Sequence, residues 1–150
     1  VKDVDYGYVG DIRQESVNTS LVYFLLKQNT VPVFAPLTHS EGMMLNTNAD
    51  TIASVLAVAM SKHFDVRLIF CFEKKGVLED VNKQDSVIRH LPRKRYDDLL
   101  SKKAFVDGIL PKLENAYAAI NAGVKEVLIG EASDLVKNTG HETEGTLITP

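Results

Sequence analysis

A near-continuous apolar run, Val66-Arg67-Leu68-Ile69-Phe70-Cys71-Phe72, constrains the fold more than any other stretch of this chain. A strand that is apolar at successive positions is typical of a parallel sheet covered on both faces. The run follows a segment, Thr51 to His63, whose apolar residues recur at the spacing of one helical face. We therefore expect a helix followed by a buried strand, which is the repeating unit of an α/β fold.

The rest of the chain continues this alternation of helical and extended patterns. Apolar segments predict strands at 31–35, near 87–88, at 124–130 and at 145–148, and helices at 16–28, 96–103 and 111–122. The buried face expected for the first helix consists of Val17, Leu21, Phe24 and Leu25. Residues 1–13 predict a hairpin with Gly7 at its turn, whereas 37–42 and 131–144 are expected to be loops. The order of elements predicts an α/β domain with a mainly parallel sheet, either one domain or half of a larger one.

Composition excludes several classes of protein. A net charge of −3 over 150 residues gives no electrostatic case for binding nucleic acid or an anionic membrane. No apolar run approaches the roughly 18 residues that a membrane helix requires. The single cysteine, Cys71, excludes an internal disulfide and fits a reducing compartment, and its place in the apolar run predicts a small buried side chain. The chain begins at Val1, so we expect a processed or truncated piece of a longer protein.

The junction Asn46-Thr47-Asn48-Ala49-Asp50 links an apolar extended run to the start of the helix predicted from Thr51. Asn48 or Asp50 can cap the free N–H groups at that start, and both residue types are favoured there. Such a junction is either a capped helix and nothing more, or an anion site, because a helix N-terminus attracts negative charge. The local pattern favours the two interpretations about equally.

Two more clusters are expected at the edge of the sheet where α/β proteins bind ligands. Glu73 to Gly76 follows the strongest strand, and Asp107 to Lys112 forms a glycine-containing turn at the start of a helix. A lysine in a first helical turn opposes the helix dipole unless an anion lies nearby, although a surface lysine needs no such explanation. The chain has no G-x-x-x-x-G-K-[ST], G-x-G-x-x-G or G-x-S-x-G motif, and its four histidines lack metal-ligand spacing. The residues alone therefore support a phosphate-binding α/β domain and no more.

An ordered set of short motifs extends over nearly the whole chain. The strings are Asp5-Tyr6-Gly7-Tyr8-Val9-Gly10-Asp11-Ile12, Val31-Pro32-Val33, Gly42, Asn46-Thr47-Asn48-Ala49-Asp50, Gly76-Val77-Leu78, Ile109-Leu110-Pro111-Lys112, Ala119 to Val124, and Gly145-Thr146. This set, in register, resembles the N-acetylglutamate kinases of the amino acid kinase family. The resemblance implies a three-layer αβα sandwich, incomplete here. Residues 1–150 would be its C-terminal, ATP-binding half, and the hairpin at about 1–13 would belong to the acyl-amino-acid side. The glycine-rich phosphate loop and first lysine of the preceding half are absent, so this piece is expected to be inactive alone.

The same resemblance implies roles for particular residues. Lys112 would stabilise charge on the transferring phosphoryl group, Asp50 would hold Lys112 in position, and Asn46 would bind the α-carboxylate side of the substrate. The nucleotide would lie against Phe72, Glu73, Gly76 and Gly108, with no protein ligand to a metal. The implied reaction is phosphorylation of N-acetyl-L-glutamate, or another N-acylglutamate, by ATP with Mg²⁺ in arginine biosynthesis. The implied setting is a cytoplasmic homo-oligomer that binds neither membrane nor nucleic acid.

Departures from the family pattern leave alternatives open. Cys71-Phe72-Glu73 stands where relatives usually have L-T-D, and Asp107-Gly108-Ile109 where they usually have two glycines and a methionine. Tyr6 and Tyr8 leave acetyl and succinyl groups both admissible, and the short segment between Gly130 and Gly145 gives no basis for arginine inhibition. Alternatives are a sibling such as glutamate 5-kinase, aspartokinase or UMP kinase, or a non-catalytic nucleotide-binding regulatory domain.

Overall fold

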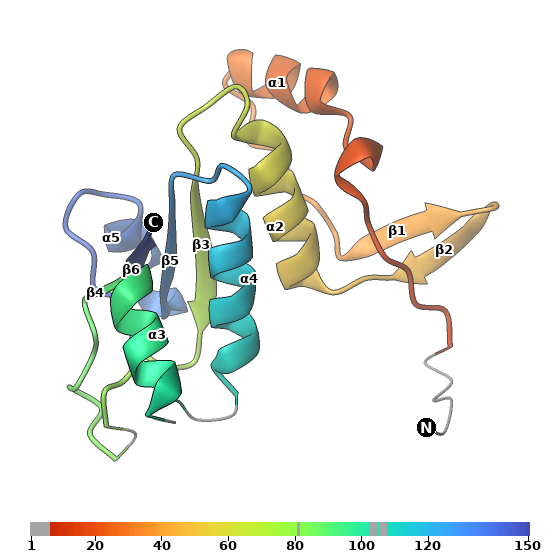
Figure 1. The fold of residues 1–150 in the computed structure, drawn as a ribbon. Coiled ribbons are helices and arrows are strands. Elements are labelled where there is room, and N and C mark those ends of the chain that lie inside the picture. The colour runs from red at the N-terminus through yellow and green to blue at the C-terminus, as the bar shows by residue number, and fades with distance from the viewer. Residues whose placement is uncertain (1–6, 81, 103–104, 106–107) are drawn as a thin grey trace.

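The computed structural model describes residues 7–80, 82–102, 105 and 108–150, and Figure 1 shows their arrangement. Two 3₁₀ turns, five α-helices and six strands are formed by these residues. In chain order they are η1 (Gln14–Ser16), α1 (Thr19–Lys27), β1 (Leu37–Ser40), β2 (Met43–Asn46), α2 (Ala49–Met60), β3 (Arg67–Phe72), β4 (His90–Pro92), α3 (Arg93–Ser101), α4 (Leu110–Asn121), β5 (Glu126–Glu131), η2 (Ala132–Asp134), α5 (Leu135–Asn138) and β6 (Thr146–Thr149).

The larger sheet has four strands in the order β3-β5-β6-β4. β3 runs parallel to β5 and β4 runs parallel to β6, while β5 and β6 are antiparallel. The prediction of an α/β fold with a mainly parallel sheet is therefore confirmed. Because β3 and β5 each follow a helix, their carboxyl ends lie at the same end of the molecule as the N-termini of α2 and α4 (Figure 1).

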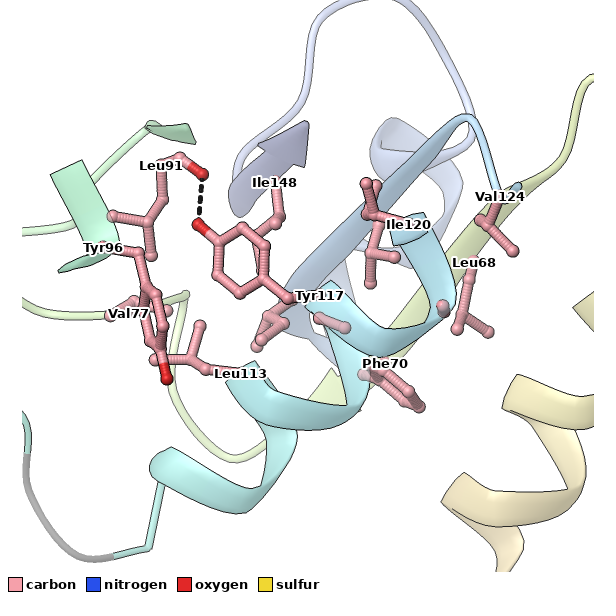
Figure 2. Packing of buried hydrophobic residues seen from close by; sticks show 14 of the residues in the cluster. Leu68, Phe70, Val77, Leu91, Tyr96, Leu113, Tyr117, Ile120, Val124 and Ile148 are labelled. Carbon is pink, nitrogen blue, oxygen red and sulfur yellow. Dashed lines mark hydrogen bonds between the residues drawn. The ribbon is translucent and has the colours of Figure 1, made fainter. Parts of the chain in front are cut away.

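The hydrophobic core lies between this sheet and the helices α2, α3 and α4. Leu68 and Phe70 of β3 are buried in the same cluster as Leu113, Ala116 and Tyr117 of α4 (Figure 2). These apolar contacts hold the first turn of α4 next to the end of β3. That placement brings together two of the three clusters predicted to border the ligand site.

Tyr117 places a polar group inside the core and satisfies it there. Its hydroxyl donates a hydrogen bond of 2.8 Å to the Leu91 carbonyl, the dashed line in Figure 2. Burial raises the pKa of Tyr117 well above its usual value, and burial likewise raises the pKa of the neighbouring Tyr96. A buried phenol that stays protonated contributes stability below its unfolded-state pKa of about 10, and this contribution is lost as the pH rises through the folded-state pKa.

We expect Tyr117→Phe to lower the free energy of unfolding by about 1–3 kcal/mol at pH 8, because the buried Leu91 carbonyl loses its donor. The difference in the free energy of unfolding between the variant and the wild type should shrink above about pH 10. Only the wild type has this phenol, and its burial opposes ionisation in the folded state but not in the unfolded state. Urea denaturation at pH 8 and pH 10.5 measures both effects. A difference that stays constant or grows with pH would contradict the assigned role of burial.

The opposite face of the sheet carries the short helix α5 and a polar clamp. Arg67 bonds Glu126 at 2.6 Å and donates to the carbonyls of Asn138 and Gly140 at 3.1 and 2.5 Å. Cys71 lies on this same face, four residues after Arg67 in β3, and is exposed. The prediction that Cys71 is buried was wrong: the helix on this face, α5, packs mainly against β5.

Other predictions also differ from the structure. The predicted loop 131–144 contains η2 and α5. Residues 31–35 form no strand, and Val31 and Val33 are 83% and 92% exposed. These β-branched residues pair with no other strand among the described residues, and Pro32 has no N–H to donate to a sheet. The predicted loop 37–42 is instead a hairpin, β1 paired with β2, whose turn residues Glu41 and Gly42 both have positive φ.

Helix α1 is present but is rotated about its axis relative to the prediction. Val22 is the buried residue, whereas Leu21 and Phe24 are 52% and 58% exposed. Part of the predicted hairpin, residues 1–6, lies outside the described residues. The remainder runs beside β2, with Val9 bridged to Asn46.

Candidate functional site

The junction between β2 and α2 positions an acidic side chain at a helix N-terminus. Asn48 caps α2, because its side-chain oxygen accepts a hydrogen bond of 3.1 Å from the Thr51 N–H. Asp50 lies in the first turn that follows, where a carboxylate is favoured by the helix dipole. From the sequence, either Asn48 or Asp50 could be the capping residue. The structure assigns capping to Asn48 and leaves the Asp50 side chain available for another contact.

Helix α4 places a basic side chain at its own N-terminus. Pro111 occupies the first turn, where its missing N–H costs nothing, and Lys112 is the next residue. Ile109 at the N-cap provides no side-chain hydrogen bond. A lysine in this position is electrostatically unfavourable by itself, so its partner matters.

Lys112 and Asp50 meet in an ion pair between the two helices. The Lys112 ammonium lies 2.5 Å from Asp50 Oδ2, and the two side chains are 20% and 35% exposed. The carboxylate compensates for the unfavourable position of the lysine by accepting a hydrogen bond from its ammonium group. Because two helix N-termini and a lysine adjoin here, the site presents positive potential to an anion.

Aromatic rings from β3 line the other side of the Lys112 ammonium. Its Nζ lies 5.5 Å from the centroid of Phe70 and 6.0 Å from that of Phe72. Both distances are within the range of cation–π attraction. Lys112 is thus held by a carboxylate from α2 and by ring faces from β3, two elements that are far from it in the sequence.

A pocket opens next to this pair, beyond the end of β3. Its lining includes all four residues predicted to contact a nucleotide, Phe72, Glu73, Gly76 and Gly108. The remaining lining residues are Lys74, Val77, Leu78, Phe105 and Ile109. The walls are therefore mostly apolar, with charged side chains from one loop, as expected for a small-molecule site. Asp107, the start of the predicted turn, lies outside the described residues.

Gly76 has a packing role as well as a place in the pocket wall. A Cβ at this position would come within 2.7 Å of Thr146 Oγ1, and that oxygen accepts a 2.8 Å hydrogen bond from the Val77 N–H. Any larger residue would break this buried bond, which fixes the loop to β6. Thr146 of the Gly145-Thr146 motif therefore holds the loop that forms part of the pocket wall.

Asn46 is the predicted site residue that the structure brings neither into the pocket lining nor into the Lys112–Asp50 ion pair. It ends β2, its backbone bonds Tyr8 and Gly10, and it is exposed. Sequence reasoning missed Phe70, Phe105 and Thr146 as contributors to the site. Only the alternation of β3 could have indicated Phe70, since it lies on the same strand face as Phe72.

Two further observations concern the described part of the chain. None of its helices is both long and apolar enough to cross a membrane. Among the same residues, no group of three or more His, Cys, Asp or Glu side chains is gathered to hold a metal ion.

Residues 2–131 match the amino acid kinase family. Acetylglutamate kinase from Parabacteroides distasonis is 50% identical over 99% of this chain and 56% of its own length. The enzyme of the same name from Bacteroides thetaiotaomicron is 52% identical over 93% of this chain and 54% of its own length. The chain thus spans about half the length of the curated relatives that it matches.

The backbone of this chain aligns with those of several solved structures. The crystal structure of smu.665 from Streptococcus mutans aligns with a TM-score of 0.72 at 34% identity, covering 99% of this chain and 54% of that one. Giardia lamblia carbamate kinase bound to AMP-PNP aligns with a TM-score of 0.64 at 17% identity, covering 89% of this chain and 49% of that one. The second likeness is one of fold.

Proposed function

Since this chain belongs to the amino acid kinase family, we propose that the full-length protein transfers the γ-phosphoryl group of ATP to the side-chain carboxylate of N-acetyl-L-glutamate, as a step of arginine biosynthesis. The observation that carries the proposal is the Lys112–Asp50 pair, set between two helix N-termini beside a pocket. The acetylglutamate kinases that are about 50% identical to this chain support the choice of acceptor.

The reaction needs charge stabilisation more than proton transfer. A carboxylate oxygen of the acceptor attacks the γ-phosphorus, the bond to the β-phosphate oxygen breaks, and an acyl phosphate and ADP are formed. A glutamate carboxylate has a pKa of about 4.3, so it is already ionised at pH 7 and requires no general base. Negative charge spreads over the transferring group in the transition state, and Lys112 is the residue that we assign to stabilise it.

The pocket beside Phe72 and Gly76 is where we propose that the nucleotide binds. Its apolar walls suit a base. One of its lining residues, Phe72, has its ring centroid 6.0 Å from Lys112 Nζ, and a lysine at that distance suits phosphates. Within the described residues no acidic cluster is available to hold Mg²⁺. We propose that Mg²⁺ would be held by the phosphates of ATP, the way this ion commonly enters kinases.

The acyl-amino-acid site is proposed to lie near Asn46 and the segment that runs beside β2. Asn46 would bind the α-carboxylate side of the substrate. Tyr8 is 73% exposed and its carbonyl accepts a hydrogen bond from the Asn46 N–H, so it would contact the acyl group. We further propose a cytoplasmic homo-oligomer, for which exposed apolar side chains such as Phe24 and Val33 offer a surface.

The test is ATP-dependent phosphorylation by the full-length protein, with N-acetylglutamate, N-succinylglutamate, glutamate and aspartate offered side by side. We expect turnover on an N-acylated glutamate, with the acetyl compound preferred. Turnover on free glutamate or aspartate would assign the protein to a sibling kinase. Nucleotide binding without turnover on any acceptor would indicate a regulatory domain. The 150 residues alone are expected to be inactive, because relatives that carry the activity in their name are nearly twice as long.

A further inference from the structure

Phe72 belongs to two parts of the site at once. Its ring lies 6.0 Å from the Lys112 ammonium, and its side chain also lines the pocket next to Glu73 and Gly76. Phe70, the other ring near Lys112, is 3% exposed and is packed in the core. Phe70 is therefore fixed by its neighbours, whereas Phe72 is half-buried at the boundary between core and pocket.

Lys112 needs more than Asp50 to be held in one place. A lysine side chain has four flexible methylene groups and a nearly spherical charge, so a single carboxylate restricts its direction only weakly. Ring faces add a second, directional attraction for the ammonium and exclude water from one side of it. The Lys112 side chain is 20% exposed, and an anionic group would reach the ammonium through this exposed part.

We propose that Phe72 is a positioning residue: its ring holds the Lys112 ammonium against Asp50 and couples the position of that ammonium to what fills the pocket. A ligand that contacts Phe72 from the pocket side fixes the ring, and the ring in turn fixes Lys112. This inference rests on the proposed function only for its kinetic consequence. The contact itself does not depend on which reaction the protein performs.

The kinetic test compares Phe72→Leu with Phe72→Tyr in the full-length protein. Leucine keeps the apolar wall but removes the ring face, so we expect kcat to fall about 10-fold while the KM for ATP changes less than threefold. Tyrosine keeps the ring face and should retain kcat within about twofold. Loss of kcat in both variants, or in neither, would overturn the proposal.

Phe64→Leu is the matched control. Phe64 also lies beneath a lysine, with Lys27 Nζ 5.9 Å from its ring centroid, but it follows the far end of α2 and does not line the pocket. The substitution removes the same kind of contact and should leave kcat unchanged. A 10-fold loss in this variant would show that ring-to-leucine changes act through general destabilisation.

A spectroscopic measurement separates this inference from the proposed reaction. Protons above a ring face are shielded, so the Lys112 ε-methylene signals of the full-length protein should lie upfield of those of exposed lysines. We expect Phe72→Leu to reduce that upfield shift and Phe72→Tyr to retain it. If no acceptor is phosphorylated but these shifts behave as stated, the proposed function fails and the positioning role stands. Unchanged shifts in Phe72→Leu would overturn the positioning role, whatever the activity.

Discussion

Replacing Lys112 with alanine in the full-length protein is expected to lower kcat for N-acetylglutamate phosphorylation by about 10²-fold or more, a loss comparable to removing one fixed donor to a developing negative charge. The ammonium lies 2.5 Å from Asp50 Oδ2, so the carboxylate restricts its position. Alanine removes that charge without filling its space. Because the contact strengthens in the transition state, kcat should fall much more than KM rises.

Steady-state kinetics with ATP and the acceptor varied in turn measure this effect. Lys125→Ala is the matched control, since Lys125 also bonds an aspartate, Asp65, at 2.8 Å, but that pair follows the opposite end of α4 and is exposed. The control should leave kcat unchanged. A Lys112→Ala enzyme with unaltered kcat would remove Lys112 from the mechanism, whereas equal losses in both variants would point to destabilisation.

Asp50→Ala is the second substitution for which we expect a loss of kcat of about 10²-fold. The reason differs, because Asp50 acts through Lys112: without the carboxylate, the ammonium sits in a first helical turn with no counter-charge and can adopt other rotamers. Asp65→Ala provides the control, since it removes the partner of an exposed lysine. Asp50→Asn keeps the shape and tests the charge alone.

The double variant Asp50→Ala, Lys112→Ala distinguishes joint action from independent action. If Asp50 serves to orient Lys112, removing both should cost little more than removing Lys112 alone. Additive losses, about 10⁴-fold in total if each single loss is 10²-fold, would mean that Asp50 contacts the substrate by itself. Urea denaturation of each variant shows whether a kinetic loss is accompanied by unfolding.

Some features of the site were determined by local sequence. The apolar run at 66–72 and the helical spacing at 51–63 led to a strand and a helix at those places, because burial and backbone periodicity act over neighbouring residues. The Asn48 cap and the proline in the first turn of α4 are equally local. These signals set where Asp50 and Lys112 stand along their helices.

Other features could not follow from local pattern, because they depend on which surfaces come together. The exposure of Cys71 and Val33 and the rotation of α1 depend on whether a neighbouring element covers each face. The β1–β2 hairpin includes a polar segment that the sequence predicts to be a loop. The segment forms a hairpin because two residues with positive φ reverse the chain there.

The sequence by itself determined the α/β alternation, the helix starts and the two charged residues in the first turns of α2 and α4. Only the tertiary structure decided that the ammonium of Lys112 meets Asp50, 62 positions away, and lies near the rings of Phe70 and Phe72. The physical reason is that parallel pairing of β3 with β5 and the packing of α4 on Leu68 and Phe70 set the two helix N-termini side by side. Contacts of that kind are selected by the whole core, and no short stretch of sequence contains them.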